Sequence, residues 1–262
     1  MILRVAKRKP QGRPGAVQQL ALEAERGFRR LALPAPVASA HVENAQSRLA
    51  AACAAVNNVL LTVRLSRAVD RAIEKKDLRG RLADTQLDVL RSAIVFAGAG
   101  LDAALKELIR TSIRPLAQTS TLAKKKYLTF VAMHLAAPDS PISRTVLAEV
   151  LTATDGAQAE LLNRYERYLT GDSLQSAAQV DGVCSALGID DRRIRQRLRP
   201  DGLLDQMFHA RNEIVHELDL LSKGRRLRKV SDVESFAREA LEVTQEIINH
   251  VATALGKPRA AT

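Results

Sequence analysis

Three residues on one short stretch of the chain carry groups that can bind a phosphate and move a proton. Arg211 has a permanently charged guanidinium, Asn212 a carboxamide, and His216 an imidazole that titrates near neutral pH. A guanidinium can hold two phosphate oxygens at once, and an imidazole can act as a general base or acid. The stretch therefore contains the groups needed for chemistry at a phosphate ester.

The surrounding residues predict that these groups lie on an amphipathic helix over 203–221. The apolar stripe of that helix contains Leu204, Met207, Phe208, Ile214, Val215, Leu218 and Leu221. Arg211 falls inside the stripe, where a guanidinium is unfavourable unless it is paired or opens to a cleft. Asn212 and His216 are four residues apart and lie on a polar line beside the stripe. Helix geometry alone favours a simpler explanation, a structural arginine held by a carboxylate with a surface histidine nearby.

The rest of the chain predicts an all-α protein, because helical periodicity dominates and alternating β-branched runs are nearly absent. We expect helices over 16–32, 42–76, 85–110, 121–136, 142–169, 173–186, 203–221 and 231–255. Pro115 is expected to close the third helix, and a capping pattern at 231–234 to open the last. Such elements pack as an up-and-down bundle. We predict a basic flexible tail over 1–14, extra N-terminal helices over 15–80 that pack on the core, and a helical domain over 81–258.

The segment from Ile94 to Ala103 has the G-x-G-x-x-A spacing of a dinucleotide-binding fingerprint. That fingerprint works only where a strand precedes the glycines, and here the preceding residues continue a helical stripe. We therefore expect Gly98 and Gly100 to lie within a helix and to let another helix or a bulky side chain come close. No cofactor is expected.

The chain is 46% hydrophobic, so it can bury a core, and its formal net charge is +11. A basic balance favours nucleic acid or an anionic membrane surface, although a generally basic soluble protein has the same composition. Two basic segments flank the 203–221 helix. We expect their arginines either to contact RNA phosphates or to form a solvated face: Arg192, Arg193, Arg195, Arg225, Arg226 and Arg228. Aromatic residues are only 3% of the chain, and Tyr127, beside three lysines, is a candidate for base stacking.

Cys53 and Cys184 lie far apart and form neither a disulfide framework nor a metal-ligand spacing, which fits a reducing compartment. The first residues lack the apolar run of a secretory signal. No stretch approaches the roughly 18 consecutive apolar residues of a membrane span. We expect a cytoplasmic protein without a metal site or a membrane partner.

The Arg-Asn-x-x-x-His pattern of residues 211–216, on the penultimate helix of the predicted bundle, resembles the Arg-x(4–6)-His signature of the HEPN superfamily of ribonucleases. The apolar run 90–97 and the residues 101–105 are similar to an early helix of the RiboL-PSP-like HEPN subgroup. In that subgroup an acidic residue after the run faces the arginine and histidine. Asp102 fits this position, so we expect it within salt-bridge or water-bridged reach of Arg211. The resemblance covers roughly residues 85–255.

This resemblance implies a metal-independent endoribonuclease of the toxin or defence type, with a possible antitoxin or neighbouring defence protein as partner. The ribose 2′-OH would attack the phosphate, with His216 transferring the proton and Arg211 binding phosphate oxygens. Asn212 would hold a phosphate oxygen or the imidazole, and the RNA ends would be a 2′,3′-cyclic phosphate and a 5′-hydroxyl. Because Arg211 and His216 lie about 140° apart on a helix, the resemblance further implies a homodimer whose two copies of the helix complete one site.

Two alternatives stay open. A catalytically silent HEPN module that binds RNA or a partner protein would carry the same motif, and RNA cleavage in EDTA separates the two. The turn at 200–202 distantly suggests a DNA-binding helix-turn-helix. Against that interpretation, the following helix begins with Leu203, Leu204 and Met207, where a recognition helix would present polar residues.

Overall fold

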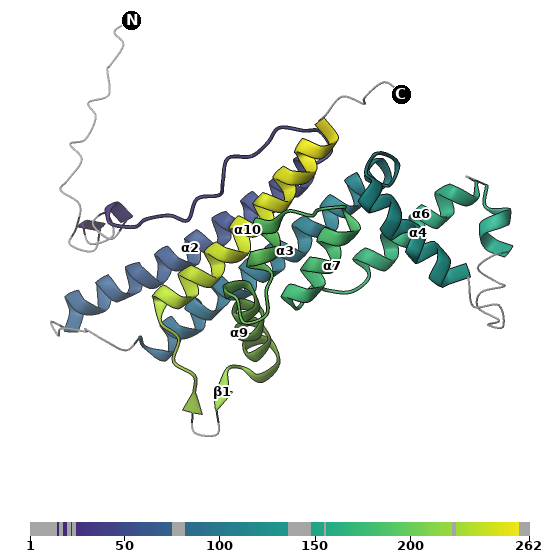
Figure 1. The fold of residues 1–262 in the computed structure, drawn as a ribbon. Coiled ribbons are helices and arrows are strands. Elements are labelled where there is room, and N and C mark those ends of the chain that lie inside the picture. The colour runs from purple at the N-terminus through teal and green to yellow at the C-terminus, as the bar shows by residue number, and fades with distance from the viewer. Residues whose placement is uncertain are drawn as a thin grey trace, which may run out of the picture.

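Figure 1 shows the computed structural model of the chain, in which long helices pack into an all-α bundle. The structure describes residues 15, 18–19, 22, 25–74, 82–135, 148–154, 156–221 and 224–256, without the side chains of 72–74, 134–135, 220–221 and 224–225. The predicted tail over 1–14 lies outside the described residues.

Three long helices form the centre of the bundle: α2 (Glu43–Glu74), α3 (Asp84–Thr119) and α10 (Val230–Gly256). They lie side by side in Figure 1, and α2 runs opposite to α3 and α10. The buried stripe of α2 comprises Leu49, Cys53, Val56, Leu60 and Val63. This stripe and the buried residues of α3 and α10 belong to one hydrophobic core. The predicted second and last helices are confirmed over the described residues.

The helix α3 is longer than predicted, because it continues through Pro115 to Thr119. A proline inside a helix removes a backbone hydrogen bond and costs about 3 kcal/mol. The turns around it are buried through Ile113, Leu116 and Ala117. Because burial of one large apolar side chain stabilises by roughly 1.5–3 kcal/mol, packing outweighs the proline here. The predicted helix end before Pro115 is wrong.

Shorter helices pack around the three-helix centre: α4 (Thr121–Leu135), α6 (Ala157–Thr170), α7 (Ala177–Ala186) and α8 (Arg192–Arg197). Figure 1 shows α4 and α6 extending beyond one end of that centre. The helix predicted over 142–169 is interrupted in the described part, because residues 153, 154 and 156 are not helical and α6 begins only at Ala157. Gly156 has a φ of 88° there, which glycine adopts without strain. Ser176 caps α7 by accepting the Gln179 N–H, so this helix begins after the predicted residue 173.

The helix α9 (Leu203–Glu217) carries the motif and packs against α3 and α10. It ends before the predicted residue 221, because Leu218 and Asp219 adopt left-handed backbone conformations with φ of 52° and 57°. The chain then forms a small antiparallel hairpin of β1 (Leu220–Leu221) and β2 (Gly224–Arg225). The prediction of a helix followed by a basic loop missed both the turn and the hairpin.

The segment that precedes α2 is not helical between residues 28 and 39, so the helix predicted over 16–32 is wrong in its second half. Leu31 is buried, and its N–H and C=O both bond to the carboxamide of Asn57 on α2. The carboxamide of Asn249 on α10 bonds to the same segment. These side chains replace the hydrogen bonds of a helix, because a backbone buried against the bundle must have its polar groups paired.

Gly98 and Gly100 lie inside the continuous helix α3, so the rejection of the dinucleotide fingerprint is confirmed. A Cβ at Gly100 would lie 2.1 Å from the Cβ of Ala52, which shows that the glycine permits the close packing of α2. A Cβ at Gly98 would lie 3.6 Å from Cγ of Arg211, an ordinary contact. The predicted close approach of another helix is therefore found at Gly100, where α2 packs. The predicted close approach of a bulky side chain is found at Gly98, where Arg211 packs.

One described helix, α2, is long and apolar enough over Glu43–Arg71 to cross a membrane, with a mean hydropathy of 1.5. The bundle buries 33% of its most apolar stretch. The sequence count missed this helix because polar residues such as Asn57 interrupt its apolar run. Its buried side is also the part of the core that packs on α3.

Candidate active site on α9

Arg211 lies at the edge of the bundle core. The residues one and two turns before it, Leu204 and Met207, are fully buried, while Arg211 itself is half-buried. Its aliphatic stem packs against Gly98 of α3, and its Nη1 donates to Oδ1 of Asn212 at 2.9 Å. Among the described residues, no carboxylate forms an ion pair with this guanidinium. The charge of Arg211 is therefore partly desolvated and held by a neutral amide.

Asn212 connects Arg211 to the segment between α6 and α7. Its Nδ2 donates to the carbonyl oxygen of Gln175 at 3.3 Å, while its Oδ1 accepts from Arg211. The neighbouring Leu174 donates its N–H to Oδ1 of Asp102 on α3 at 2.8 Å. Both α3 and α9 thus hold the same short segment, and a rigid amide fixes the direction of the guanidinium.

Asp102 lies near this site but is not the ion-pair partner of Arg211. Its carboxylate accepts the Leu174 N–H and pairs with Lys106 at 3.1 Å, one turn further along α3. Of the predicted salt-bridge or water-bridged reach to Arg211, the direct salt bridge is absent from the described contacts, and the water-bridged alternative stays a prediction. Asp102 bonds to the segment that Asn212 also bonds to.

His216 lies in the last turn of α9 and is exposed. Its neighbours Val215 and Leu218 are 43% and 61% exposed, although both belong to the stripe that was predicted to be buried. Ile214 still packs against the core, so the exposed apolar surface at the end of α9 consists of Val215 and Leu218 among the described residues. Within one chain, His216 makes no hydrogen bond or ion pair with the described residues.

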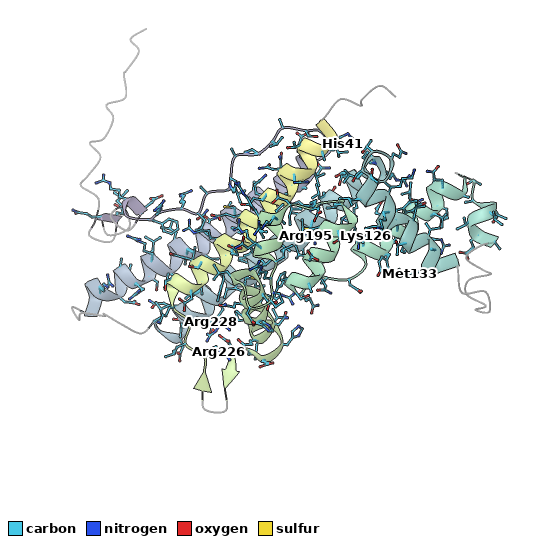
Figure 2. The ribbon with its side chains drawn as sticks, in the orientation of Figure 1. His41, Lys126, Met133, Arg195, Arg226 and Arg228 are labelled. Atoms are coloured by element: carbon cyan, nitrogen blue, oxygen red, sulfur yellow. The ribbon has the colours of Figure 1, made fainter. Side chains whose placement is uncertain are left out.

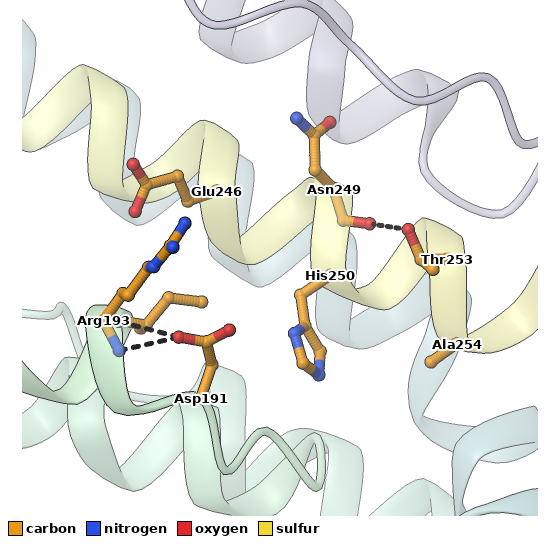
Figure 3. A pocket seen from close by; sticks show the side chains of 8 residues that line it. Asp191, Arg193, Glu246, Asn249, His250, Thr253 and Ala254 are labelled. Atoms are coloured by element: carbon orange, nitrogen blue, oxygen red, sulfur yellow. Dashed lines mark hydrogen bonds between the residues drawn. The ribbon is translucent and has the colours of Figure 1, made fainter.

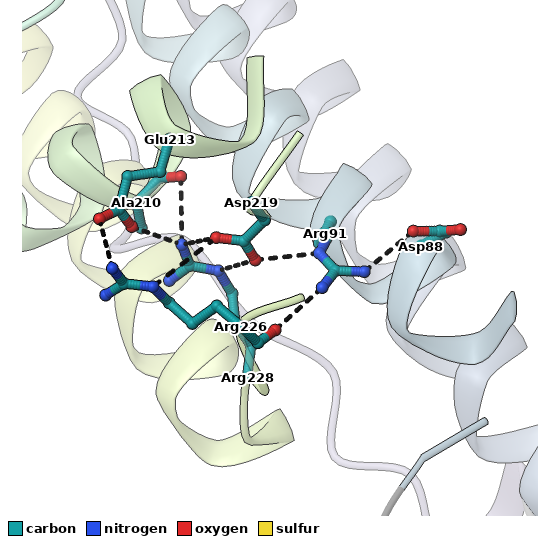
Figure 4. Close-up of polar contacts among 7 residues, drawn as sticks. All are labelled: Asp88, Arg91, Ala210, Glu213, Asp219, Arg226 and Arg228. Atoms are coloured by element: carbon teal, nitrogen blue, oxygen red, sulfur yellow. Dashed lines mark hydrogen bonds and ion pairs between the residues drawn. The ribbon is translucent and has the colours of Figure 1, made fainter. Parts of the chain in front are cut away.

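A second polar cluster lies just after α9, and the sequence analysis missed it (Figure 4). Asp219, whose side chain is fully buried, accepts from Arg228 Nη2 at 2.6 Å and from Arg91 Nε at 3.0 Å. Glu213 of α9 pairs with Arg226 and Arg228 at 2.8 and 2.9 Å. This cluster joins α3, α9 and the segment after the hairpin, and we call it the Asp219 cluster.

The electrostatics of the Asp219 cluster favour an ionised carboxylate. Burial alone would raise the pKa of Asp219, but hydrogen bonds from Arg228 and Arg91, and their charges, outweigh it. The pKa of Asp219 therefore lies below its ordinary value. The only sequence signal for the cluster was Arg91, a charged residue among the apolar positions of α3.

The arginines predicted to bind RNA differ in their surroundings. Arg192 and Arg193 are exposed on α8. Arg195 pairs with Asp181 and Asp190, both at 3.0 Å. Arg228 is only 9% exposed and pairs with Glu213 and Asp219, so its side chain is held in the Asp219 cluster, and its role as an RNA contact stays a prediction.

The other two predicted RNA contacts lie at the hairpin. Arg226 is 45% exposed and pairs with Glu213, and Figure 2 places it beside Arg228 at the foot of the bundle. The side chain of Arg225 lies outside the described residues. Part of the basic segment after α9 therefore forms ion pairs that join it to α9, and only some of its charge faces solvent.

On the face between α8 and α10, Arg193 lines a cavity of about 380 Å³ together with Glu246, Asn249 and His250 (Figure 3). Next to it, Arg197 is held by three carboxylates of α10, those of Glu239, Glu242 and Glu246. The cavity therefore has acidic and basic groups on its walls, which weakens it as a phosphate site.

Within the described ranges, no three histidine, cysteine, aspartate or glutamate side chains lie together as a metal site requires. The cysteines Cys53 and Cys184 are free and buried. Burial raises the pKa of both thiols, that of Cys184 to about 12. Neither thiol is therefore a thiolate nucleophile at neutral pH.

Compared with protein-family models, with curated proteins and with solved structures, the chain matches none of them. Its site is interpreted from its own geometry and chemistry.

Proposed function

We propose that the chain is a metal-independent endoribonuclease of the HEPN type, with its site on α9. The observation that carries the proposal is the state of Arg211. Its guanidinium is half-buried, and its bonded partner among the described residues is the neutral amide of Asn212. A partly desolvated cation without a carboxylate favours binding of an anion, and a phosphate diester supplies the oxygens that a guanidinium binds best.

The proposed reaction uses the ribose 2′-OH of the RNA as nucleophile. The 2′ oxygen attacks the neighbouring phosphorus, the bond from phosphorus to the 5′ oxygen breaks, and a 2′,3′-cyclic phosphate forms. His216 removes the 2′ proton or protonates the departing 5′ oxygen, which leaves as a hydroxyl. Arg211 stabilises the negative charge that builds on the phosphate oxygens. Asn212 holds the guanidinium in the required direction.

A second copy of the chain completes the site in this proposal. Arg211 faces α3, whereas His216 is exposed beyond the core, so one chain brings them together poorly. Exposed Val215 and Leu218 flank His216 and supply apolar surface for contact between two α9 helices. A two-fold axis would then place His216 of each subunit next to Arg211 of the other.

The separation of Arg211 and His216 within one chain also favours a second candidate, a catalytically silent module. In that case Arg211 binds RNA, and the exposed side of α9 binds another protein. RNA cleavage distinguishes the two candidates.

Incubation of a labelled RNA with the purified chain in excess EDTA tests the proposal. Cleavage with 2′,3′-cyclic phosphate ends supports it, and the variant His216→Ala should abolish cleavage. His209→Ala is the matched control, because His209 is an exposed histidine on the same helix that pairs with Asp205. Binding of RNA without cleavage, or products with 5′-phosphate ends, would contradict the proposed reaction.

Mixing two inactive variants tests the shared site. Arg211→Ala and His216→Ala are each expected to be inactive, and their mixed dimer retains one Arg211 and one His216 from different subunits. Activity should therefore return on mixing. An active chain that sediments as a monomer would contradict the shared site and leave the chemistry intact.

A further inference from the structure

A cavity of about 540 Å³ lies between α4, α6 and α7. Its walls include Lys126, Phe130 and Met133 of α4, Tyr165 and Tyr168 of α6, and Gly182 of α7. Figure 2 shows Lys126 and Met133 along the same stretch of α4. This volume is within the range of pockets that bind small organic molecules.

One wall of the cavity is aromatic. The ring of Phe130 lies 4.9 Å from that of Tyr165 and 5.2 Å from that of Tyr168, measured between centroids. Tyr168 is 61% exposed, and Met133 is 60% exposed. Tyr127, the residue predicted to stack on bases, is buried at 8% exposure, so that prediction is wrong and Tyr168 is the aromatic ring that solvent reaches.

Gly182 of α7 lies on the cavity wall and is exposed. A glycine inside a helix lowers its stability relative to alanine, because it loses more backbone freedom on folding. A Cβ at Gly182 would meet nothing within 4 Å, so packing inside the described chain does not require the glycine. An added side chain would instead take up space on the cavity wall.

The polar groups around the cavity suit a nucleobase. Lys126 lies on the cavity wall and supplies a positive charge there. Gln179, Asp172 and Asp181 also line the cavity, and Asp181 is paired with Arg195. The amide and carboxylate groups can bond to the edge of a base, so the cavity suits a base rather than a phosphate. Burial raises the pKa of Tyr165 to about 12, so its phenol is neutral.

The cavity is connected to the site on α9. Leu174 lines the cavity, and its N–H donates to Asp102. The next residue, Gln175, accepts from Asn212, the residue that holds Arg211. The segment that joins α6 and α7 therefore borders the cavity and also bonds to the residue that holds Arg211.

We propose that this cavity binds a nucleobase of single-stranded RNA that flanks the phosphate bound by Arg211. The base lies against Tyr168, and Lys126 binds the backbone of the same strand. The inference rests on the proposed function, since it assigns the cavity to the same substrate. It gives the helices between residues 121 and 186 a role in holding that substrate.

Binding of a short fluorescent 2′-O-methyl oligoribonucleotide in EDTA tests this inference, because the blocked 2′ position prevents cleavage. Tyr168→Ala should weaken binding about tenfold, since loss of one stacked base typically has this effect. Tyr168→Phe should keep the affinity. Leu128→Ala is the matched control, because Leu128 is a 52% exposed residue of α4 outside the cavity wall.

Gly182→Leu separates filling of the cavity from damage to the fold. Leucine favours a helix more than glycine, so thermal unfolding should occur at the same or a higher temperature, while binding weakens about tenfold. Parent-level affinity in both Tyr168→Ala and Gly182→Leu would overturn the inference, even if the chain cleaves RNA. Weakened binding in both variants, in a chain that never cleaves RNA, would overturn the proposed reaction and retain the cavity as an RNA site.

Discussion

The Arg211 site lies on α9, and the Asp219 cluster lies at the end of the same helix and directly after it. The arginines of these two regions have opposite kinds of partner. Arg228 is 9% exposed and shares its charge with Asp219 and Glu213. Arg91 is 5% exposed and pairs with the same Asp219 and with Asp88. Arg211 is also partly buried, yet its bonded partner in the described part of the chain is an amide.

This difference distinguishes a structural arginine from one that can act on a ligand. A buried ion pair compensates the loss of hydration of both charges, so little attraction remains for a third charged group. An amide bonds to a guanidinium without neutralising it, so the positive charge of Arg211 remains. The simpler explanation that the sequence favoured, an arginine held by a carboxylate, fits Arg91 and Arg228, whereas Arg211 has no carboxylate partner among the residues that the structure describes.

Substitution of the two kinds of arginine should therefore affect different properties, RNA cleavage for Arg211 and stability for Arg228. These are the largest effects that we expect. Arg211→Ala should lower RNA cleavage by about 100- to 1,000-fold and change the free energy of unfolding by less than about 1 kcal/mol. Arg228→Ala should lower the free energy of unfolding by about 3–5 kcal/mol, because it leaves Asp219 with too few partners. Urea unfolding and a cleavage assay on both variants measure the contrast. Equal losses of stability in the two variants would remove the distinction.

The carboxylate of the cluster should show the next largest effect. Asp219→Asn keeps the shape of the side chain but leaves Arg91 and Arg228 without its charge, so we expect a loss of about 3 kcal/mol in the free energy of unfolding. Asp190→Asn is the control, because Asp190 is 70% exposed and its pair with Arg195 is on the surface. That control should change stability by less than about 1 kcal/mol. A loss in Asp219→Asn as small as in the control would show that the cluster does not stabilise the fold.

The sequence predicted helices, which follow from a local period of apolar residues. It missed ion pairs and hydrogen bonds between residues that are far apart in the chain. The period of Leu204, Met207 and Phe208 was sufficient to place α9 and the edge position of Arg211. Asp219 has no such signal, because its partner Arg91 is 128 residues away and joins it only after α3 and α9 have packed. The partners of Asp102 were missed for the same reason, since Leu174 lies 72 residues further along the chain.

The ends of helices were predicted poorly where tertiary packing decides them. Pro115 is a strong local signal for a helix end, but the buried turns beside it keep α3 intact. The sequence around Leu218 does not predict a left-handed conformation. The helix ends there because the next residue, Asp219, forms ion pairs with arginines from other parts of the chain. The exposure of Val215 and Leu218 was likewise missed, because a helical period cannot show where the core ends along the helix.

The stability supplied by Asp219 should depend on pH, with a smaller effect than either substitution. Its pKa in the folded chain lies below the ordinary value of 3.8, so the unfolded chain binds the proton more readily. The contribution is complete above the unfolded pKa and is lost as the pH falls from about 4 through the folded pKa. Urea unfolding of the parent chain and Asp219→Asn should differ most at neutral pH and converge below pH 4. A constant difference across this range would contradict an ionised Asp219.

The smallest effect that we expect concerns the glycine beneath Arg211. Gly98→Ala should raise the free energy of unfolding by roughly 0.5–1 kcal/mol, because alanine favours a helix more than glycine. The added methyl group would lie 3.6 Å from Cγ of Arg211, an ordinary contact that leaves the guanidinium in place. Cleavage should therefore stay within a few-fold of the parent chain.

Gly100→Ala is the control for that substitution, because its methyl group would lie 2.1 Å from the Cβ of Ala52 and force α2 and α3 apart. We expect it to lower the free energy of unfolding by about 1–3 kcal/mol. The pair thus compares one glycine that the packing of two helices requires with one that only borders the Arg211 site. If Gly98→Ala were as destabilising as Gly100→Ala, Arg211 would be packed as tightly as the core, and it would no longer differ from the arginines of the Asp219 cluster in its freedom to bind a phosphate.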